Sequence, residues 1–215
     1  MSAARASALQ VQPGSMEQLR QFADGGYLYA LLDGSEHPDK MPDLDRMGPT
    51  RCVHLFCQPS EQAEAQFSPV LVQVDSTLLE WIVSSLWKEP WGVFALSKAG
   101  IETLRAHFRK FLLVELPGGE RWYFRFYDPR ILRIYLPNCF SWELQKFFGP
   151  VRGFAIPYPA GQDVWIVKGP SQVASDRQIT DPNVTLMWQI RPEQVRAFTR
   201  AMEGGKGTTG QMPLF

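Results

Sequence analysis

Apolar runs of strand length alternate with helical patterns through the middle of the chain, and this alternation limits the fold more than any other feature. "YLYALLDG" at 27–34, "PVLVQVD" at 69–75 and "WGVFAL" at 91–96 each predict a buried strand. "STLLEWIVSSLW" has apolar residues at helical spacing, with Thr77 and Glu80 placed as a capping box. A second helix is expected after Ser97. The pattern predicts an α/β fold, with α+β as the alternative, in which helices flank a mixed β-sheet.

The rest of the chain adds a hairpin and a smaller C-terminal lobe. "FLLVEL" and "RWYFRFY" flank the turn "PGGE" as the two strands of the hairpin, and Asp128-Pro129 marks the start of a short helix. Prolines and glycines concentrate between 149 and 170, which places a lobe boundary near residue 150. We expect an N-terminal lobe at 1–150, a smaller lobe at 151–202 and a flexible tail at 203–215. Residues 1 to about 14 are expected to form a loose leader, and 37–49 an exposed loop.

Charge and hydropathy argue against two classes of partner. The 22 basic residues balance the 22 acidic ones, whereas proteins that bind nucleic acid usually carry a basic excess. No stretch approaches the ~18 apolar residues of a membrane span, and the N-terminus lacks the apolar run of a signal peptide. Three cysteines give no disulfide framework. We expect a cytoplasmic protein that binds neither nucleic acid nor membrane.

The short motifs that resemble catalytic or metal-binding signatures each lack a required feature. "GGKGTTG" at 204–210 has no Ser or Thr after Lys206, as a phosphate loop requires. In "CVHLFC", a strand would point Cys57 away from Cys52 and His54. "DLDR" at 43–46 resembles a phosphatase signature but lies in an expected loop, and His107 is expected on a solvated basic helix face. We therefore expect no catalytic residue, no cofactor and no metal.

The stretch "RWYFRFYDPR" at 121–130 places two arginines inside an aromatic strand. Read with period two, Trp122, Phe124 and Phe126 point to the core, and the intervening arginines and tyrosines point to the opposite face. That opposite face carries Arg121, Tyr123, Arg125 and Tyr127. It is either a solvated surface of the sheet or a place where a partner binds.

Arg130 is expected in the first turn of a helix, where the helix dipole disfavours a cation unless a carboxylate accompanies it. That carboxylate belongs to Asp128, Asp33 or Glu143 in an internal network, or to another protein. Asp33 and Asp128 each follow an apolar strand. They therefore serve either as turn and cap residues or as an acid/base pair at one edge of the sheet.

Several of these segments together resemble a known family, the type VI secretion effector adaptors (Tap/TEC chaperones), which load toxic effectors onto the VgrG spike. The resemblance covers roughly residues 27 to 157, and "WQIRPEQVRAF" resembles the final strand and helix of family members. The segments that carry it are "YALLDG", "SPVLVQVD", "WGVFALS", "LRAHFRKFLLVELPGGERWYFRFYDPRILRIYLP" and "ELQKFFGPVRGFAIP".

The resemblance implies a non-enzymatic cytoplasmic adaptor of a Gram-negative bacterium whose partners are a cognate secreted effector and a VgrG spike protein. The family signature falls on Asp33, Trp91, Arg105, Arg109, Arg125, Asp128, Pro129, Arg130, Phe148, Gly149 and Pro150. These residues either contact a partner or fix the fold. The chain departs from the family in its short, Gly-rich C-terminal end, where members often carry a fuller second lobe.

A chaperone of this kind needs an exposed apolar surface, and aromatic residues near residue 150 are the candidates for it. The candidates are Trp142, Phe147, Phe148, Phe154, Tyr158 and Trp165. The alternative is that these aromatics join the two lobes. Two other functions remain open, an enzyme that uses Asp33, Asp128 and Arg125 at the sheet edge and an immunity-like inhibitor of an active toxin domain. A pocket of ~300 Å³ or more with converging carboxylates would favour the enzyme.

Overall fold

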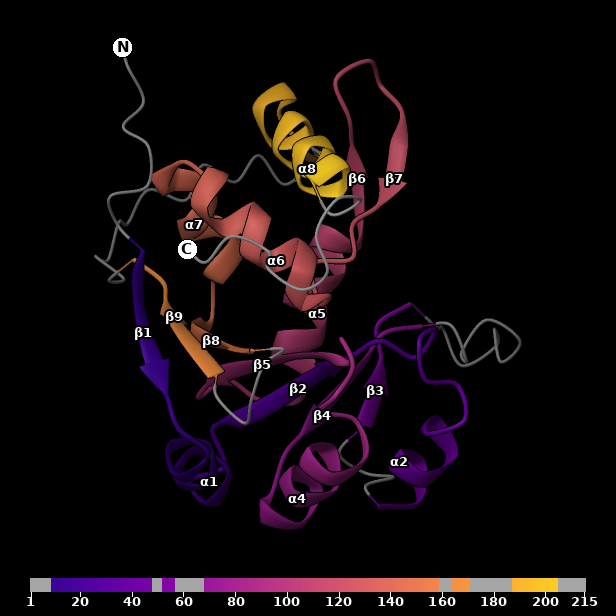
Figure 1. The fold of residues 1–215 in the computed structure, drawn as a ribbon, viewed down its shortest axis with the longest axis vertical. Coiled ribbons are helices and arrows are strands. Elements are labelled where there is room, and N and C mark those ends of the chain that lie inside the picture. Colours follow the sequence, from indigo (N-terminus) through magenta and orange to yellow (C-terminus); the bar gives the residue numbers. More distant parts are fainter. Residues whose placement is uncertain (1–8, 48–51, 57–67, 159–163, 171–186, 205–215) are drawn as a thin grey trace.

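A seven-stranded sheet forms the middle layer of the protein (Figure 1). The computed structural model describes residues 9–47, 52–56, 68–158, 164–170 and 187–204. From one edge to the other, the strands are β1 (Gln10–Gly14), β9 (Val164–Lys168), β8 (Val151–Pro157), β5 (Gly92–Ser97), β2 (Leu28–Leu32), β4 (Val70–Gln73) and β3 (Cys52–His54). Each neighbouring pair in this order is antiparallel.

A second, smaller sheet lies on one side of the first. Its central strand, β6 (Leu113–Glu115), pairs antiparallel with β7 (Arg121–Tyr123) and parallel with β10 (Trp188–Gln189). With helices packed around both sheets, the predicted α/β class with a mixed arrangement of strands is confirmed. Within the described residues, the parallel pairing occurs in the small sheet, whereas the large sheet is antiparallel.

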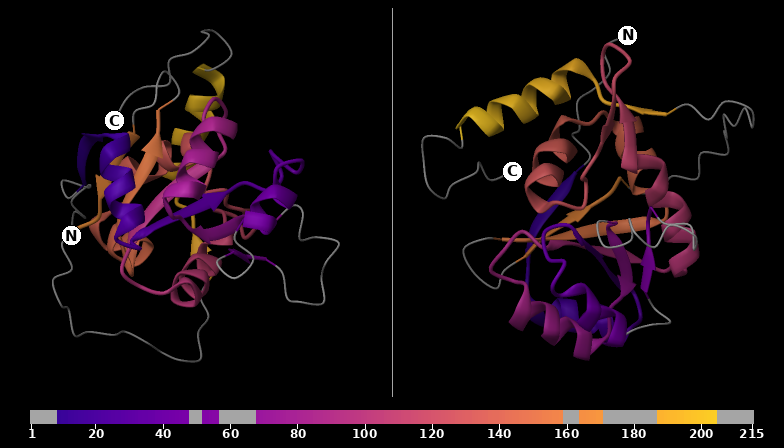
Figure 2. Two further views of the ribbon diagram at one scale, coloured as in Figure 1. Left: turned by 90° about the horizontal axis from the view of Figure 1, so that it is seen from below. Right: turned by 90° about the vertical axis from the view of Figure 1, so that its right-hand side faces the viewer.

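Helices cover both faces of the large sheet, so the core has two parts (Figures 1 and 2). On one face, Leu28, Ala30 and Leu32 pack against α1 (Met16–Asp24), α2 (Met41–Met47) and α4 (Ser76–Ser85). On the other face, Tyr29 and Leu31 share a core with α5 (Ile101–Leu112), α6 (Pro129–Tyr135) and α7 (Ser141–Phe148). Alternate residues of β2 therefore serve opposite cores, which explains why the strand reads as a continuous apolar run.

The helix starts follow the expected chemistry, but two of them lie elsewhere than the sequence suggested. Asp128 caps α6 with Pro129 as its first residue, as predicted, and Ser15 caps α1 through a capping box with Gln18. α4 is capped by Asp75 rather than Thr77, and α5 begins after Gly100 rather than after Ser97. The Ser97 hydroxyl instead donates to the carbonyl of Pro150 at 2.8 Å and so joins β5 to the start of β8.

Two segments that the sequence suggested to be irregular are regular elements. Residues 10–14 form β1, which pairs with β9 from Gln10↔Lys168 to Gly14↔Val164. The long-range pairing supplies the order that the polar sequence "QVQPG" does not predict by itself. Within the expected exposed loop, α2 forms because Met41 and Leu44 pack against the core.

The large sheet continues across the boundary that the sequence suggested near residue 150. β8 lies on the C-terminal side of that position and pairs with β5, and β9 extends the sheet to β1. Further along the chain, β10 joins the small sheet and α8 (Pro192–Gly204) packs against α6. The short helix η1 (Leu136–Asn138), which follows α6, also contacts α8. The described parts of 1–150 and 151–202 therefore share one sheet.

An ion pair fixes this returning segment. Arg191 donates to both carboxylate oxygens of Glu143, at 2.8 and 3.0 Å, and its guanidinium lies 3.8 Å from the ring centre of Phe140. Glu143 is only 1% exposed. Trp188 adds a hydrogen bond from its indole nitrogen to the Tyr135 hydroxyl at 2.9 Å. The buried carboxylate thus holds β10 and α8 against α6 and α7.

A search of the described helices for length and hydropathy finds none that would cross a membrane.

Candidate functional site: a charged cluster and an adjoining pocket

The aromatic segment at 121–127, which contains Arg121 and Arg125, leaves the small sheet earlier than the alternation of its apolar and polar residues suggested. β7 ends at Tyr123, and Phe124 and Phe126 then turn into the core. Trp122, expected in the core, is 57% exposed, and Tyr127, expected on the opposite face, is buried. At Tyr127 the pattern fails because a sheet's alternation applies only while the backbone remains extended, and residues 126 and 127 form a turn. Trp122 lies within β7, but all three residues of that strand are exposed, so neither face of β7 is covered by the core.

Arg125 binds two carboxylates of the segment that follows β2. Its Nη2 contacts Asp33 and donates to Glu36 Oε1 at 2.8 Å. Asp33 is only 1% exposed, and its backbone N–H donates to the carbonyl of Trp91 at 2.9 Å. Its Oδ1 also accepts hydrogen bonds from the backbone and hydroxyl of Ser35. Arg125 therefore links the ends of β2 and β7, which are far apart in the sequence.

Arg130 binds Asp128, the residue that caps its own helix. Arg130 Nη2 donates to Oδ2 at 2.6 Å and Nε donates to Oδ1 at 3.0 Å, while Oδ1 also accepts from the backbone N–H of Arg130. Glu36 Oε1 lies 3.9 Å from Arg130 Nη2. The cation in the first helical turn thus has the carboxylate partner that the dipole argument required, and this partner lies within the chain. Glu143, the third candidate, pairs with Arg191 instead.

The electrostatics follow from these partners. Burial opposes the charge of Arg125, but hydrogen bonds and charge from Glu36 and Asp33 outweigh it and raise the arginine's pKa. The hydrogen bond to Asp128 raises the pKa of Arg130 in the same way. Burial, followed by the negative charge of Asp33, raises the pKa of the Tyr127 phenol. We call Asp33, Glu36, Arg125, Asp128 and Arg130 the charged cluster.

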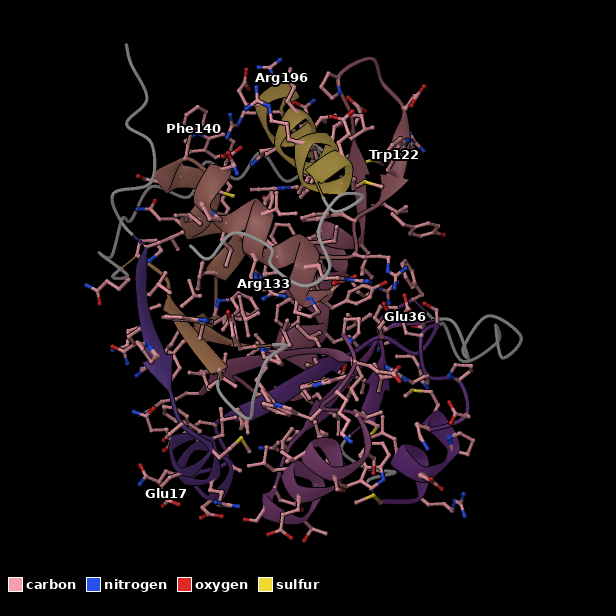
Figure 3. The ribbon with its side chains drawn as sticks, viewed as in Figure 1. Glu17, Glu36, Trp122, Arg133, Phe140 and Arg196 are labelled. Carbon is pink, nitrogen blue, oxygen red and sulfur yellow. The ribbon has the colours of Figure 1, made fainter. Side chains whose placement is uncertain are left out.

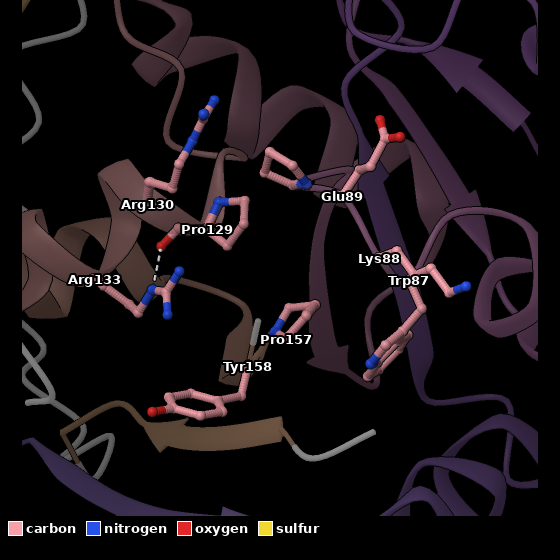
Figure 4. A pocket seen from close by; sticks show the side chains of 9 residues that line it. Trp87, Lys88, Glu89, Pro129, Arg130, Arg133, Pro157 and Tyr158 are labelled. Atoms are coloured by element: carbon pink, nitrogen blue, oxygen red, sulfur yellow. Dashed lines mark hydrogen bonds between the residues drawn. The ribbon is translucent and has the colours of Figure 1, made fainter. Parts of the chain in front are cut away.

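A pocket of about 230 Å³ adjoins the charged cluster (Figure 4). Three segments form its walls: residues 87–90 before β5, the start of α6, and the end of β8. The lining residues are Trp87, Lys88, Glu89, Pro90, Pro129, Arg130, Arg133, Pro157 and Tyr158. Five of the nine lining residues are aromatic or proline, and the other four, Lys88, Glu89, Arg130 and Arg133, are charged.

Arg133 differs from the other two arginines of this region. Its Nε donates to the carbonyl of Pro129 at 3.0 Å. Among the described residues, no carboxylate lies within ion-pair distance of its guanidinium. Burial lowers the pKa of Arg133, the opposite of the shift at Arg125 and Arg130. Figure 4 shows its guanidinium between Pro129 and Tyr158, whereas Arg130 extends away from Tyr158.

The structure separates the other signature residues from the charged cluster or buries them. Trp91 is fully buried and packs edge-on against Phe94, and Phe148 and Phe154 pack against each other in the core. Arg105 donates to the carbonyl of His54 at 3.1 Å, and Arg109 is exposed on α5. Of the signature set, the charged cluster therefore collects Asp33, Arg125, Asp128 and Arg130.

The aromatic candidates near residue 150 divide between core and surface. Phe147, Phe148 and Phe154 are buried where α7 meets β8, so for these three the joining role is the one that the structure supports. Trp142 is 49% exposed, and Tyr158 and Trp165 are half-buried. Two further exposed aromatics lie on the hairpin: Trp122, which the sequence placed in the core, and Tyr123, on the face predicted to be solvated or to bind a partner (Figure 3 labels Trp122).

His107 is not on a solvated face as expected. It is buried, its Nε2 lies 2.8 Å from the carbonyl oxygen of Phe147, and burial lowers its pKa to about 4. Gly149, with φ of 48°, passes so close that a Cβ there would lie 2.3 Å from the imidazole. The histidine is therefore a neutral packing residue between α5 and the end of α7.

The metal and phosphate motifs give no site among the residues that can be described. Cys57 and the glycine-rich stretch from Gly205 onward lie outside those residues. Within the described residues, no group of three potential metal ligands comes together. Asp43 and Arg46 form an ion pair on α2, at 2.6 Å.

Comparison with known proteins gives one match. The family model described as "Domain of unknown function (DUF4123)" matches residues 28–146, which include the whole charged cluster. No curated protein and no solved structure matches the chain. Because the family match covers more than half of the chain, the protein belongs to the DUF4123 family.

Proposed function

We propose that this protein is an effector adaptor of a type VI secretion system, which holds a cognate effector and helps to seat it on the VgrG spike without catalysing a reaction. The observation that carries the proposal is the family match over 28–146, because this domain is known in effector adaptor and chaperone proteins of that system. The same residues contain "LRAHFRKFL" and "FRFYDPR", on which the sequence resemblance to those adaptors rests.

The geometry of the charged cluster supports a structural role for its carboxylates. An acid/base pair needs side chains that are free to exchange a proton with a substrate. Asp33 is held by Arg125 and Ser35, and Asp128 by Arg130 and a helix terminus. The adjoining pocket, at about 230 Å³, is also smaller than the ~300 Å³ at which small-molecule sites begin. The enzyme alternative therefore has less support than the adaptor.

The exposed aromatic side chains on the hairpin and on α7 support a role in binding another polypeptide. Trp122, Tyr123 and Trp142 are 57, 68 and 49% exposed. Tryptophan and tyrosine are enriched among the residues that contribute most to protein interfaces. In a protein without a partner, such side chains expose apolar area to water, which binding would remove.

The proposal is tested by isolating the tagged chain from its native host and identifying bound proteins by mass spectrometry. We expect a toxin encoded beside its gene, together with a VgrG protein. The toxin is then divided into its delivery segment and its toxic domain. An adaptor binds the delivery segment, whereas binding to the toxic domain alone would favour the immunity-like alternative.

A further inference from the structure

The pocket beside the charged cluster contains a cation that forms no ion pair with a carboxylate in the described part of the chain. Arg125 and Arg130 are held by Asp33, Glu36 and Asp128, but Arg133, one helical turn beyond Pro129, has only the carbonyl of that proline. A guanidinium has five N–H donors in a planar fork. Arg133 is half-buried, so water cannot fully satisfy the donors that the carbonyl leaves unused.

The surroundings of Arg133 favour a carboxylate over other occupants. Arginine binds a carboxylate through two parallel hydrogen bonds, and such a pair gains strength where water is excluded. Lys88 on the opposite wall adds a second positive charge. Glu89, the acid on that wall, is largely exposed and lies 3.8 Å from His37 Nδ1. The carboxylate of an incoming ligand is therefore expected to bind at Arg133, on the wall opposite Glu89.

The proline and aromatic residues that line the rest of the pocket indicate which kind of side chain would bind next to the carboxylate. Pro129 and Pro157 are buried, Tyr158 is half-buried, and Trp87 closes the opposite side (Figure 4). These flat apolar surfaces suit an aliphatic or proline side chain. A volume of about 230 Å³ holds one or two side chains rather than a whole cofactor. The pocket lies between residues 87–90, the start of α6 and the end of β8, where an extended segment of another polypeptide can cross it (Figure 4).

We propose that this pocket binds an extended segment of a partner polypeptide, with an aspartate or glutamate side chain on Arg133 and an adjacent apolar residue against Pro129, Pro157 and Tyr158. The inference rests on the proposed function in taking the effector as the polypeptide that supplies the segment. The charged cluster then has a defined part in binding, because it fixes the start of α6 and with it the position of Arg133.

The test uses random short peptides displayed on phage, selected on the full chain and then on the Arg133→Gln variant. We expect the peptides that bind the natural chain to share an acid next to an apolar residue. A synthetic peptide of that sequence should lose at least about thirtyfold in affinity when Arg133 is replaced by Gln. Replacing the peptide's acid by its amide should cause a similar loss, and the two changes together should cost little more than either alone.

Arg20→Gln is the matched control, because Arg20 is an exposed arginine on α1, outside both the pocket and the family signature. It should leave the affinity unchanged. Lys88→Glu provides a second test with little risk to folding, because Lys88 is exposed. It should weaken the same peptide severalfold. The melting temperature of Arg133→Gln should stay close to that of the natural chain, since no carboxylate in the described residues forms an ion pair with the Arg133 guanidinium.

Three outcomes would overturn the inference. The first is that the selected peptides lack an acidic residue, and the second is that they bind Arg133→Gln as well as the natural chain. The third is that blocking the C-terminal carboxylate of the peptide abolishes binding, whereas replacing its acidic side chain by the amide does not. The proposed function is judged separately by capture of the toxin. If the natural chain and Arg133→Gln capture it equally, the pocket inference fails and the adaptor function stands. If the peptides bind as expected but no toxin is captured, the function fails.

Discussion

Arg125, Arg130 and Arg133 lie in one short stretch, yet the surroundings of their guanidinium groups differ. The first two pair with the buried carboxylates of Asp33 and Asp128, and the third faces a pocket. Asp33 is the most deeply placed member of the charged cluster, and it joins the end of β2 to Arg125 and, through its backbone, to Trp91. Its charge therefore contributes to stability, whereas that of Arg133 is available for binding.

Replacing Asp33 by Asn should lower the free energy of unfolding by about 2 kcal/mol. The amide keeps the shape of the side chain but leaves Arg125 with Glu36 as its remaining carboxylate. Urea denaturation measures the change. The matched control is Glu36→Gln, which removes the exposed partner of the same arginine and should cost under about 1 kcal/mol. Equal effects of the two variants would contradict the structural role assigned to Asp33.

His107 predicts a pH dependence of stability. Its pKa is lowered to about 4 in the folded protein, first by burial and further by Lys110, with the Phe147 carbonyl acting in the opposite direction. The unfolded chain takes up the proton near pH 6.5. The contribution of the neutral imidazole is therefore complete above pH 6.5, is lost as the pH falls, and levels off below about 4.

The expected loss between pH 6.5 and 4 is on the order of 3 kcal/mol from this residue. Carboxylates also titrate in that range, so the measurement compares the natural chain with His107→Gln by urea denaturation at several pH values. The variant is less stable at pH 7 but should lose less stability on acidification. Parallel pH profiles for the two proteins would show that His107 does not titrate as assigned.

At the scale of helices and strands, local patterns located most elements because both faces of the sheet are buried under helices. β2, β4 and β5 lie at the apolar runs 27–34, 69–75 and 91–96 that predict buried strands. β1 could not be found this way, since its order depends on pairing with β9, far away in the sequence. The start of α5 was misplaced for a similar reason: the Ser97 hydroxyl binds Pro150 in a contact that no local pattern reveals.

The candidate site was predictable only in part. Asp33 and Asp128 stood out because each follows an apolar strand, and Arg125 because it lies inside an aromatic one. Arg130 stood out because a cation in the first turn of a helix needs a carboxylate partner. Glu36 and Arg133 were missed, since an acid in a polar loop and an arginine on a helix give no signal until the fold brings them together. The pairing of Arg191 with Glu143 likewise joins two helical segments through tertiary contact.

The ion pair between Arg191 and Glu143 gives a prediction about how β10 and α8 are attached to the rest of the protein. Replacing Glu143 by Gln removes the buried carboxylate that holds Arg191 and accepts from the backbone of Phe140. Hydrogen exchange should then accelerate at least about tenfold at Ile190, whose N–H bonds to Glu115, while amides of β2 stay protected. Glu193→Gln, at an exposed partner of the same arginine, is the control. Unchanged exchange at Ile190 in Glu143→Gln would contradict this attachment.

At the scale of the whole molecule, the sheet separates two layers of helices (Figure 1). Three exposed aromatics, Trp122, Tyr123 and Trp142, lie on the layer that carries α7 and the hairpin. The charged cluster and its pocket lie where the ends of β2, β7 and β8 approach one another. Buried arginine–carboxylate pairs hold this junction, which keeps the pocket and the aromatic surface in a fixed relation. Such a preorganised surface loses little entropy on binding.

Trp122 provides a prediction for that surface. Its replacement by Ala should leave the melting temperature nearly unchanged, because the side chain is largely exposed, and should reduce capture of a partner protein by at least about tenfold. Quantitative pull-down with the purified partner measures the effect. Met202→Ala, at another exposed apolar residue, is the control. If the two variants bind alike, the hairpin is not part of the interface.

The central claim, that this chain delivers one effector by binding it, is tested most directly by the secreted proteins of a strain that lacks its gene. The account predicts that one toxin disappears from the secreted fraction, that other substrates of the same apparatus remain, and that the natural chain restores the missing toxin. Loss of every substrate would identify a core component of the apparatus, and loss of none would contradict an adaptor function altogether.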